Sequence, residues 1–192
     1  MRKIGLMGGA FDPPHYGHLL IAEQAREECQ LDEVWFMPTK IPPHKTSSNL
    51  CKDEQRIEMV KRAIETNANY MLSLVEFERI GPSYTIDTIK VLKNKYPEID
   101  FYFIIGGDMI EYLPKWKDID ELLTLIAFIG VKRPGHNCAF VYSDKVKIIN
   151  APQLEISSSE IRERLQKGRS IRYLLPESVI EYIKEQGIYG QS

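Results

Sequence analysis

The sequence predicts an α/β fold built on a mainly parallel β-sheet. Short apolar runs, which are typical of buried strands, alternate along the chain with longer segments whose apolar residues recur at helical spacing. This alternation suits a parallel sheet, because a crossover helix must join each strand to the next. The chain has 192 residues, 43% of them hydrophobic and 27% charged, which fits one globular domain over residues 1–192 with a small helical C-terminal part.

We expect six strands and six helices. The strands are expected at residues 4–7, 34–37, 71–75, 101–105, 126–131 and 146–149. The helices are expected at residues 17–30, 52–67, 84–96, 119–123, 158–167 and 176–186. The first helix has the clearest pattern, because Ala22, Ala25 and Cys29 fall on one face at spacings of three and four. The last helix is amphipathic, and we assign it packing rather than chemistry.

Bulk properties exclude several classes of protein. The formal net charge is -2, so no large basic face for nucleic acid is expected. The most apolar stretch, residues 122–131, is too short for a membrane span, which needs about 20 residues, and no signal peptide is evident. Cys29, Cys51 and Cys138 are scattered without a CxxC pair, as is typical of free thiols in a reducing compartment. We therefore expect a cytoplasmic protein that binds neither nucleic acid nor membranes.

The first expected strand runs directly into the stretch around which a binding site is expected, Met7 to His18. Gly8 and Gly9 allow the backbone to approach a ligand closely, and two prolines stiffen the loop that follows. His15 and His18 then lie in the loop and first turn of a helix, where free N–H groups and the helix dipole favour an anion. This pattern indicates a phosphate site in preference to a purely structural turn. Zinc is disfavoured, because the two histidines lack the further ligand that a zinc site needs.

The segments after the next two strands are also candidates, because ligands of open α/β sheets bind beyond the carboxyl ends of the strands. His44 and Lys45 follow the second strand in a proline-stiffened loop, whose composition suits a solvated surface loop as well as a binding loop. After the third strand, Ser83 is expected to cap a helix. The N–H groups of Tyr84 and Thr85 would then be open to a small carboxylate, although an ordinary capped helix explains the same residues.

Later strand ends supply weaker signals. Gly106 and Asp108 follow the fourth strand and could approach a nucleotide and bond a ribose, but such a segment is more often a simple turn. Trp116 stands beside a proline and two lysines, a setting less typical of a core residue. Arg133, after the fifth strand, suits a phosphate or nucleobase contact as well as a solvated charge. Ser157 and the glutamate three positions later have capping-box spacing, which alone explains the start of a helix.

Residues 8–19, GGAFDPPHYGHL, resemble the GxFDPxHxGH signature of the nucleotidyltransferase superfamily that uses an HxGH motif. Further segments narrow the resemblance to the bacterial nicotinate-nucleotide adenylyltransferases, from residue 4 to near residue 183. These segments are PPHK at 42–45, SYTIDT at 83–88, LPKW at 113–116, RPG at 133–135 and ISSSEIR at 156–162. Gly107, where the family usually has Ala, and Ser159, where it has Thr, are minor departures.

The resemblance implies a Rossmann-like, doubly wound sheet with helices on both faces. It also implies adenylyl transfer from ATP to nicotinate mononucleotide, which gives nicotinate adenine dinucleotide and pyrophosphate in NAD biosynthesis. Mg2+ is expected to bind mainly through the ATP phosphates, with no metal held by the protein alone. A neighbouring phosphate is expected to favour the charged form of the histidines. The family has an arginine in its second helix on the mononucleotide side, for which Arg56 is the candidate.

The resemblance assigns site residues one by one. Catalysis is expected from His15, His18 and Arg162. The ATP side is expected to contain Gly8, Gly9, Phe11, His15, His18, Gly106, Asp108, Arg133, Ile156, Ser157, Ser158 and Arg162. The mononucleotide side is expected to contain Asp12, His44, Lys45, Ser83, Tyr84, Thr85 and Trp116. In this assignment Trp116 stacks on the pyridine ring, and the segment that starts at Ser83 binds the nicotinate carboxylate.

Other functions are kept as alternatives. A pantetheine-phosphate adenylyltransferase, or a cytidylyltransferase with a glycerol phosphate acceptor, would belong to the same superfamily. The segment 83–88 and Trp116 argue against both. A nucleotide-binding sensor that has lost the chemistry is a third alternative. The complete set of His15, His18, Ser157, Ser158 and Arg162 argues against it. The sequence leaves open whether the protein forms a homo-oligomer.

Overall fold

The computed structural model describes residues 1–41, 51–132, 142, 145–152 and 154–190. Within these residues six strands form one sheet in which every neighbouring pair is parallel, in the order β3-β2-β1-β4-β5-β6. The strands are β1 (Arg2–Gly9), β2 (Glu33–Pro38), β3 (Tyr70–Leu72), β4 (Ile99–Gly106), β5 (Ala127–Lys132) and β6 (Val146–Asn150). All six lie where the sequence predicts them. β3 is shorter than predicted. Its last contact with β2 is the bond from the Ser73 N–H to the Phe36 carbonyl oxygen, and beyond it the chain leaves the sheet.

The helices also follow the predicted order. The α-helices are α1 (Tyr16–Glu28), α2 (Asp53–Ile64), α3 (Thr85–Lys95), α4 (Gly107–Tyr112), α5 (Ile119–Leu125), α6 (Ser158–Gln166) and α7 (Glu177–Glu185). The short 3-10 helices η2 (Leu113–Lys115) and η3 (Ile188–Gly190) follow α4 and α7. α4 was not predicted, because it begins at Gly107 directly after Gly106, and paired glycines are poor helix formers. None of the described helices combines the length and apolar character of a membrane span.

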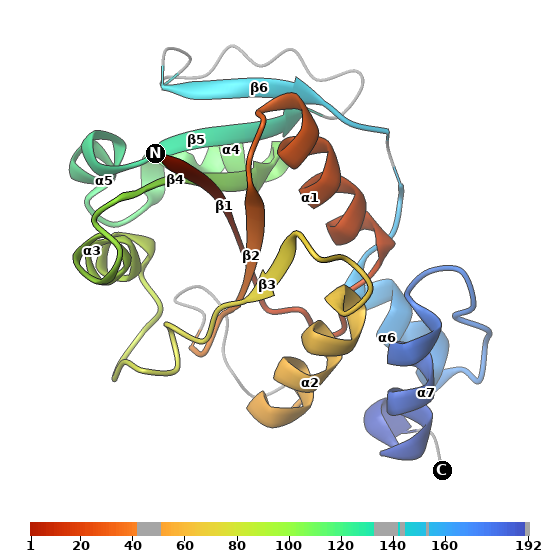
Figure 1. Ribbon diagram of the computed structural model, residues 1–192. Coiled ribbons are helices and arrows are strands. Elements are labelled where there is room, and N and C mark those ends of the chain that lie inside the picture. The colour runs from red at the N-terminus through yellow and green to blue at the C-terminus, as the bar shows by residue number, and fades with distance from the viewer. Residues whose placement is uncertain (42–50, 133–141, 143–144, 153, 191–192) are drawn as a thin grey trace.

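Helices cover both faces of the sheet. Successive residues of β4 point to opposite faces, so Ile104 joins one apolar cluster while Phe103 and Ile105 join another. The first cluster packs α1 and α2 on the sheet and extends to α6 and α7, and the second packs α3, α4 and α5 on the other face. Figure 1 shows α3 and α5 on the opposite side of the sheet from α1. The expected doubly wound, Rossmann-like architecture with a small helical C-terminal part is therefore confirmed.

The strand order locates a crevice. The chain begins in the middle of the sheet, builds outward through β2 and β3, and then crosses back to place β4 on the other side of β1. The helices that follow β1 and β4 therefore lie on opposite faces of the sheet, which leaves a crevice between the ends of these two strands. In open parallel sheets this switch point is where ligands bind, beyond the carboxyl ends of the strands. Those ends are Gly9 in β1 and Gly106 in β4.

Candidate active site

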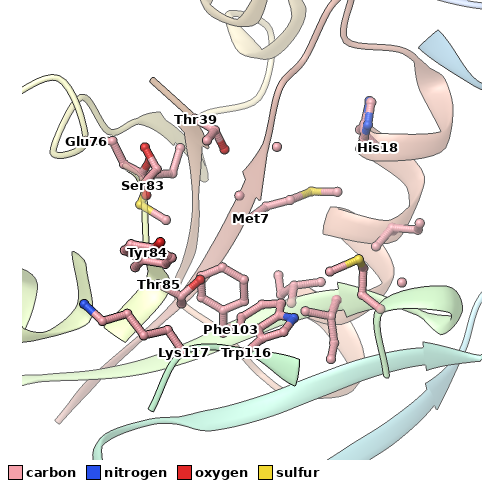
Figure 2. Close-up of a pocket in the computed structure, with 18 residues that line it drawn as sticks. Met7, His18, Thr39, Glu76, Ser83, Tyr84, Thr85, Phe103, Trp116 and Lys117 are labelled. Atoms are coloured by element: carbon pink, nitrogen blue, oxygen red, sulfur yellow. The ribbon is translucent and has the colours of Figure 1, made fainter. Parts of the chain in front are cut away.

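A pocket of about 390 Å³ lies at this switch point. It brings together eight of the expected site residues: Gly8, Gly9, His18, Ser83, Tyr84, Thr85, Gly106 and Trp116. Figure 2 shows His18 on one side of the pocket, Tyr84, Thr85 and Trp116 on the other, and Met7 between them. Gly8 is needed for its size, because a Cβ atom there would lie 3.2 Å from the Phe103 ring. Residues from both expected sub-sites thus share one space, whereas His15, Ser157, Ser158 and Arg162 do not line it.

The two motif histidines form a stacked pair at the start of α1. Their ring centroids are 3.7 Å apart with an interplanar angle of 25°. The backbone N–H of His15 donates to Nδ1 of His18 at 3.2 Å. A neutral His18 that accepts at Nδ1 carries its proton on Nε2, so this ring has one N–H available for a ligand. Gly17 allows the pairing, because a Cβ atom there would lie 3.0 Å from Nδ1 of His15.

The protein's own groups favour neutral imidazoles. Burial lowers the pKa of His15 to about 4. Burial, together with the nearby charge of His15, also lowers the pKa of His18 well below its usual value. The expectation that the histidines are charged therefore requires a bound phosphate to overcome this burial. Nδ1 of His15 is buried and has no hydrogen-bond partner among the described residues.

The start of α6 is bonded to the histidine loop. The Ser158 hydroxyl donates to the Pro13 carbonyl oxygen at 2.8 Å, and Nη1 of Arg162 donates to the Asp12 carbonyl oxygen at 2.6 Å. Ser157 caps the helix, because its Oγ accepts the N–H of Glu160 at 3.1 Å. The start of α6 therefore adjoins the loop that carries the histidines, and Ser157 and Ser158 both have structural partners.

Phe11 and Ile156 complete this junction. The buried Phe11 ring lies edge-on to the His18 ring, with centroids 5.0 Å apart. The carbonyl oxygen of Ile156 lies 4.0 Å from the position a Cβ atom would take at Gly17. Neither residue lines the pocket.

Two expected mononucleotide contacts are buried under the loop instead of lining the pocket. Asp12 is 1% exposed, and its Oδ1 accepts the Tyr189 hydroxyl at 2.5 Å and the Cys51 N–H at 3.4 Å. Arg56 has no exposed surface, and its Nη1 donates to the carbonyl oxygen of Ala10 at 2.8 Å. In this structure both side chains hold the motif loop in shape. Sequence reasoning could not separate support of a loop from contact with its ligand.

The start of α3 differs from the prediction. Ser83 is not the N-cap: its Oγ accepts the N–H of Ile41, while its own N–H donates to the Ile41 carbonyl. These two bonds tie the loop after β2 to the start of α3. Tyr84 takes the cap position, and its N–H donates to Pro82, so it is not open to a ligand. The N–H groups of Thr85 and Ile86 open the helix and have no intrahelical acceptor.

Trp116 lines the pocket directly after η2. Its ring lies edge-on to Phe103, with centroids 5.6 Å apart at 90°, and to Phe128, with centroids 6.0 Å apart at 73°. These contacts hold the half-buried indole against two aromatic rings. The stacking of Trp116 on a pyridine ring stays a prediction.

Sequence reasoning missed most of the apolar lining and three polar groups. The apolar residues are Met7, Ile21, Met37, Phe103, Ile104, Ile105 and Met109, and the polar residues are Thr39, Glu76 and Lys117. Glu76 is buried, and its Oε1 accepts the Thr88 hydroxyl at 3.0 Å, while Oε2 has no partner in the described part of the chain. Lys117 lies 3.2 Å from Asp87 and 4.6 Å from the Tyr84 ring centroid. Its place beside Trp116 was the signal that could have revealed it.

Some expected site residues are not placed. His44, Lys45 and Arg133 lie outside the described residues, and so does the side chain of Asp108. Cys29 and Cys51 are free thiols, and Cys138 lies outside the described residues.

The sheet order, the HxGH loop at the switch point and the adjoining start of α6 define a nucleotidyltransferase. A family model described as cytidylyltransferase-like matches residues 6–164, which is most of the chain.

Curated relatives and solved structures narrow this class. Nicotinate-nucleotide adenylyltransferase of Bacillus subtilis (strain 168) is 51% identical over 189 residues, covering 98% of this chain and 99% of that protein. A protein of Bacillus pumilus (strain SAFR-032) named "Probable nicotinate-nucleotide adenylyltransferase" is 50% identical with the same coverage. Plasmodium falciparum nicotinic acid mononucleotide adenylyltransferase complexed with NaAD has a TM-score of 0.82 at 26% identity, covering 100% of this chain and 99% of that chain. The chain belongs to the nicotinate-nucleotide adenylyltransferase family.

Proposed function

We propose that the protein transfers the adenylyl group of ATP to nicotinate mononucleotide, giving nicotinate adenine dinucleotide and pyrophosphate in NAD biosynthesis. One observation carries the proposal: a single pocket is lined by His18 at one end and by Thr85 and Trp116 at the other. A triphosphate beside the imidazole and a pyridine ring beside the indole can therefore lie end to end. We also propose that residues 1–192 act as one nucleotidyltransferase domain, in the cytoplasm.

The reaction needs positioning more than acid–base catalysis. A phosphate oxygen of the mononucleotide is already anionic and attacks the α-phosphorus of ATP in line. The new P–O bond forms as the bond to the bridging oxygen breaks, and pyrophosphate leaves with that electron pair. We assign the Nε2–H of His18 and the guanidinium of Arg162 to donate to the ATP phosphates. Fixed donors of this kind matter most where negative charge develops in the transition state.

We propose that Mg2+ enters with ATP and is held mainly by its phosphates and by water. Among the residues that the structure describes, no three His, Cys, Asp or Glu side chains form a group that could hold a metal ion. Mg2+ commonly keeps several waters and binds substrate phosphates, so it does not require such a group. The ion would offset phosphate charge, and the protein donors would orient the reacting groups.

The polar groups of the pocket favour an acid over an amide at the pyridine ring. The N–H group of Thr85, which has no intrahelical acceptor, and the nearby ammonium of Lys117 both suit a carboxylate. Glu76 is the opposing feature, because its unpartnered Oε2 would accept a hydrogen bond from a carboxamide NH2. We propose that the donors and the positive charge prevail and that nicotinate mononucleotide is the preferred acceptor.

The test is dinucleotide formation from ATP and Mg2+, followed by chromatography and by pyrophosphate release. Nicotinate mononucleotide, nicotinamide mononucleotide, phosphopantetheine and glycerol phosphate are compared as acceptors, the last with CTP as well. Nicotinate mononucleotide is expected to react fastest. Faster reaction of phosphopantetheine or glycerol phosphate would assign the protein to another branch of the superfamily. ATP binding without product from any acceptor would indicate a sensor.

A further inference from the structure

We infer that Tyr189 is a positioning residue for the ATP side of the site. Its hydroxyl holds the Asp12 carboxylate, and this keeps the guanidinium of Arg162 available for phosphate. The inference rests on the proposed function, because it takes Arg162 to be a phosphate ligand. It gives a role to a residue that follows the last predicted helix, to which sequence reasoning assigned packing alone.

The Asp12 carboxylate depends strongly on Tyr189. It is almost fully buried, so it needs hydrogen-bond donors from the protein. The Tyr189 hydroxyl donates to Oδ1 at 2.5 Å, a length typical of a charge-assisted bond. The second donor to Oδ1, the N–H of Cys51, is 3.4 Å away and therefore weak. Oδ2 has no hydrogen-bond partner within the described residues.

Among the described residues, Arg162 is the cation that pairs with this carboxylate. Its Nη1 lies 3.7 Å from Oδ2 of Asp12 and already donates to the carbonyl oxygen of the same residue at 2.6 Å. Its Nη2 donates to the Ser159 hydroxyl at 3.3 Å. A guanidinium has five N–H groups, so this arrangement leaves further donors for phosphate. Without the Tyr189 hydroxyl, the carboxylate would turn to Arg162 and form a closer, bidentate ion pair that consumes those donors.

The fold holds the tyrosine in place for this task. Ile188 is buried in the cluster that also contains residues of α6 and α7. Tyr189 has φ of 65°, a left-handed conformation that is costly for a non-glycine residue and must be held by its surroundings. Burial raises the pKa of Tyr189. The hydroxyl therefore stays a donor in alkaline buffers.

Tyr189→Phe is the direct test, and Tyr182→Phe is the matched control. Tyr182 lies in α7 with its ring under Arg62, 4.7 Å from the guanidinium carbon, and makes no contact with Asp12 that the structure records. In Tyr189→Phe we expect the dissociation constant and the KM for ATP to rise about tenfold or more, the scale of losing one charge-assisted bond. The KM for nicotinate mononucleotide should change less than about twofold. Tyr182→Phe should leave all three values unchanged.

The double variant Tyr189→Phe with Asp12→Asn separates competition for Arg162 from simple loosening of the loop. It removes the charge that would capture the guanidinium, so the ATP dissociation constant should return to within about twofold of the unmodified value. It also removes the unpaired buried charge, so it provides a folded protein if the single variant does not fold.

ATP affinity is measured by calorimetry, independently of turnover. Unchanged ATP affinity in Tyr189→Phe, or equal rises in both KM values, would overturn the inference, as would weak ATP binding in the double variant. An unmodified protein that makes no dinucleotide would refute the proposed function instead, while the calorimetry would still decide the role of Tyr189.

Discussion

The two ends of the site are built in different ways. At the phosphate end, side chains of α6 are bonded to main-chain carbonyl oxygens of the histidine loop, so polar groups hold one another in place. At the mononucleotide end, Phe103, Met37 and Trp116 shape an apolar space with polar groups at its edge. The first end fixes the direction of donors, and the second fixes the shape of a cavity. Changes at the first should therefore alter the rate or the affinity for ATP, and changes at the second should alter the affinity for the mononucleotide.

Removing His18 should have the largest effect. We expect His18→Ala to lower kcat about 10²–10³-fold, because one fixed donor to developing charge is lost. The thermal unfolding midpoint should change little, since the ring is partly exposed at a helix start.

A matched pair of variants tests which nitrogen acts. Gln places an amide NH2 near the former Nε2 position, whereas Asn is shorter, so His18→Gln should keep more activity than His18→Asn. Near-normal turnover in His18→Ala would show that the phosphate end does not set the rate through this donor.

Acid should destabilise the phosphate end. The pKa of His15 is about 4 in the folded protein, and that of an unfolded histidine is about 6.5. Between these pH values the unfolded chain binds a proton here that the folded protein does not. The free energy of unfolding therefore falls as the pH falls through this range, by about 3 kcal/mol for this group, and the full stability is present above about pH 6.5.

Urea unfolding at pH 7 and at pH 4.5 measures this effect. His15→Gln has no such titration, so its stability should fall less between the two pH values. Equal losses in both proteins would show that burial of His15 does not control its protonation.

At the mononucleotide end, Trp116→Ala should raise the KM for nicotinate mononucleotide about tenfold to hundredfold. Stacking of an aromatic ring on a base contributes about 1–3 kcal/mol in nucleic-acid systems. The KM for ATP should stay nearly constant. Trp116→Phe keeps an aromatic face and the ring contact with Phe103, so its KM for nicotinate mononucleotide should rise less. A similar rise in both KM values would mean that the two ends are not separable.

The smallest effect is expected from Lys117. Its side chain is 42% exposed and forms an ion pair with Asp87 at 3.2 Å. Lys117→Gln should therefore raise the KM for nicotinate mononucleotide only about threefold. Lys115 is the control, because it lies 5.0 Å from the Tyr112 ring centroid but does not line the pocket. Salt should reduce the difference between the two variants. Equal effects would indicate a general field of positive charge instead of a local contact.

Periodicity was sufficient for most of the fold. Strands and helices with a clear apolar pattern, such as β1 and α1, were predicted within a few residues of their observed ends. α4 was missed because glycines at its start carry no helical signal, and only the tertiary position after β4 forms it. The end of β3 was misjudged because Val75 is buried without belonging to a strand.

Motifs located the site but could not separate contact from support. Gly8 and Trp116 reach the pocket as expected, whereas Asp12 and Arg56 hold the loop from beneath. A motif records that a residue type is required, and both roles require it. The apolar lining escaped prediction for another reason: a strand residue that faces a cavity and one that faces the core have the same sequence pattern.

The bond between Tyr189 and Asp12 joins positions 177 residues apart. Synthesis proceeds from the N-terminus, so the ribosome makes the histidine loop 177 residues before the tyrosine that anchors it. A nascent chain that stops before α6 would contain all residues of the HxGH motif. It would lack the serines at the start of α6 and Tyr189. Catalytic competence should therefore arise late in translation, as a property of two distant segments that meet.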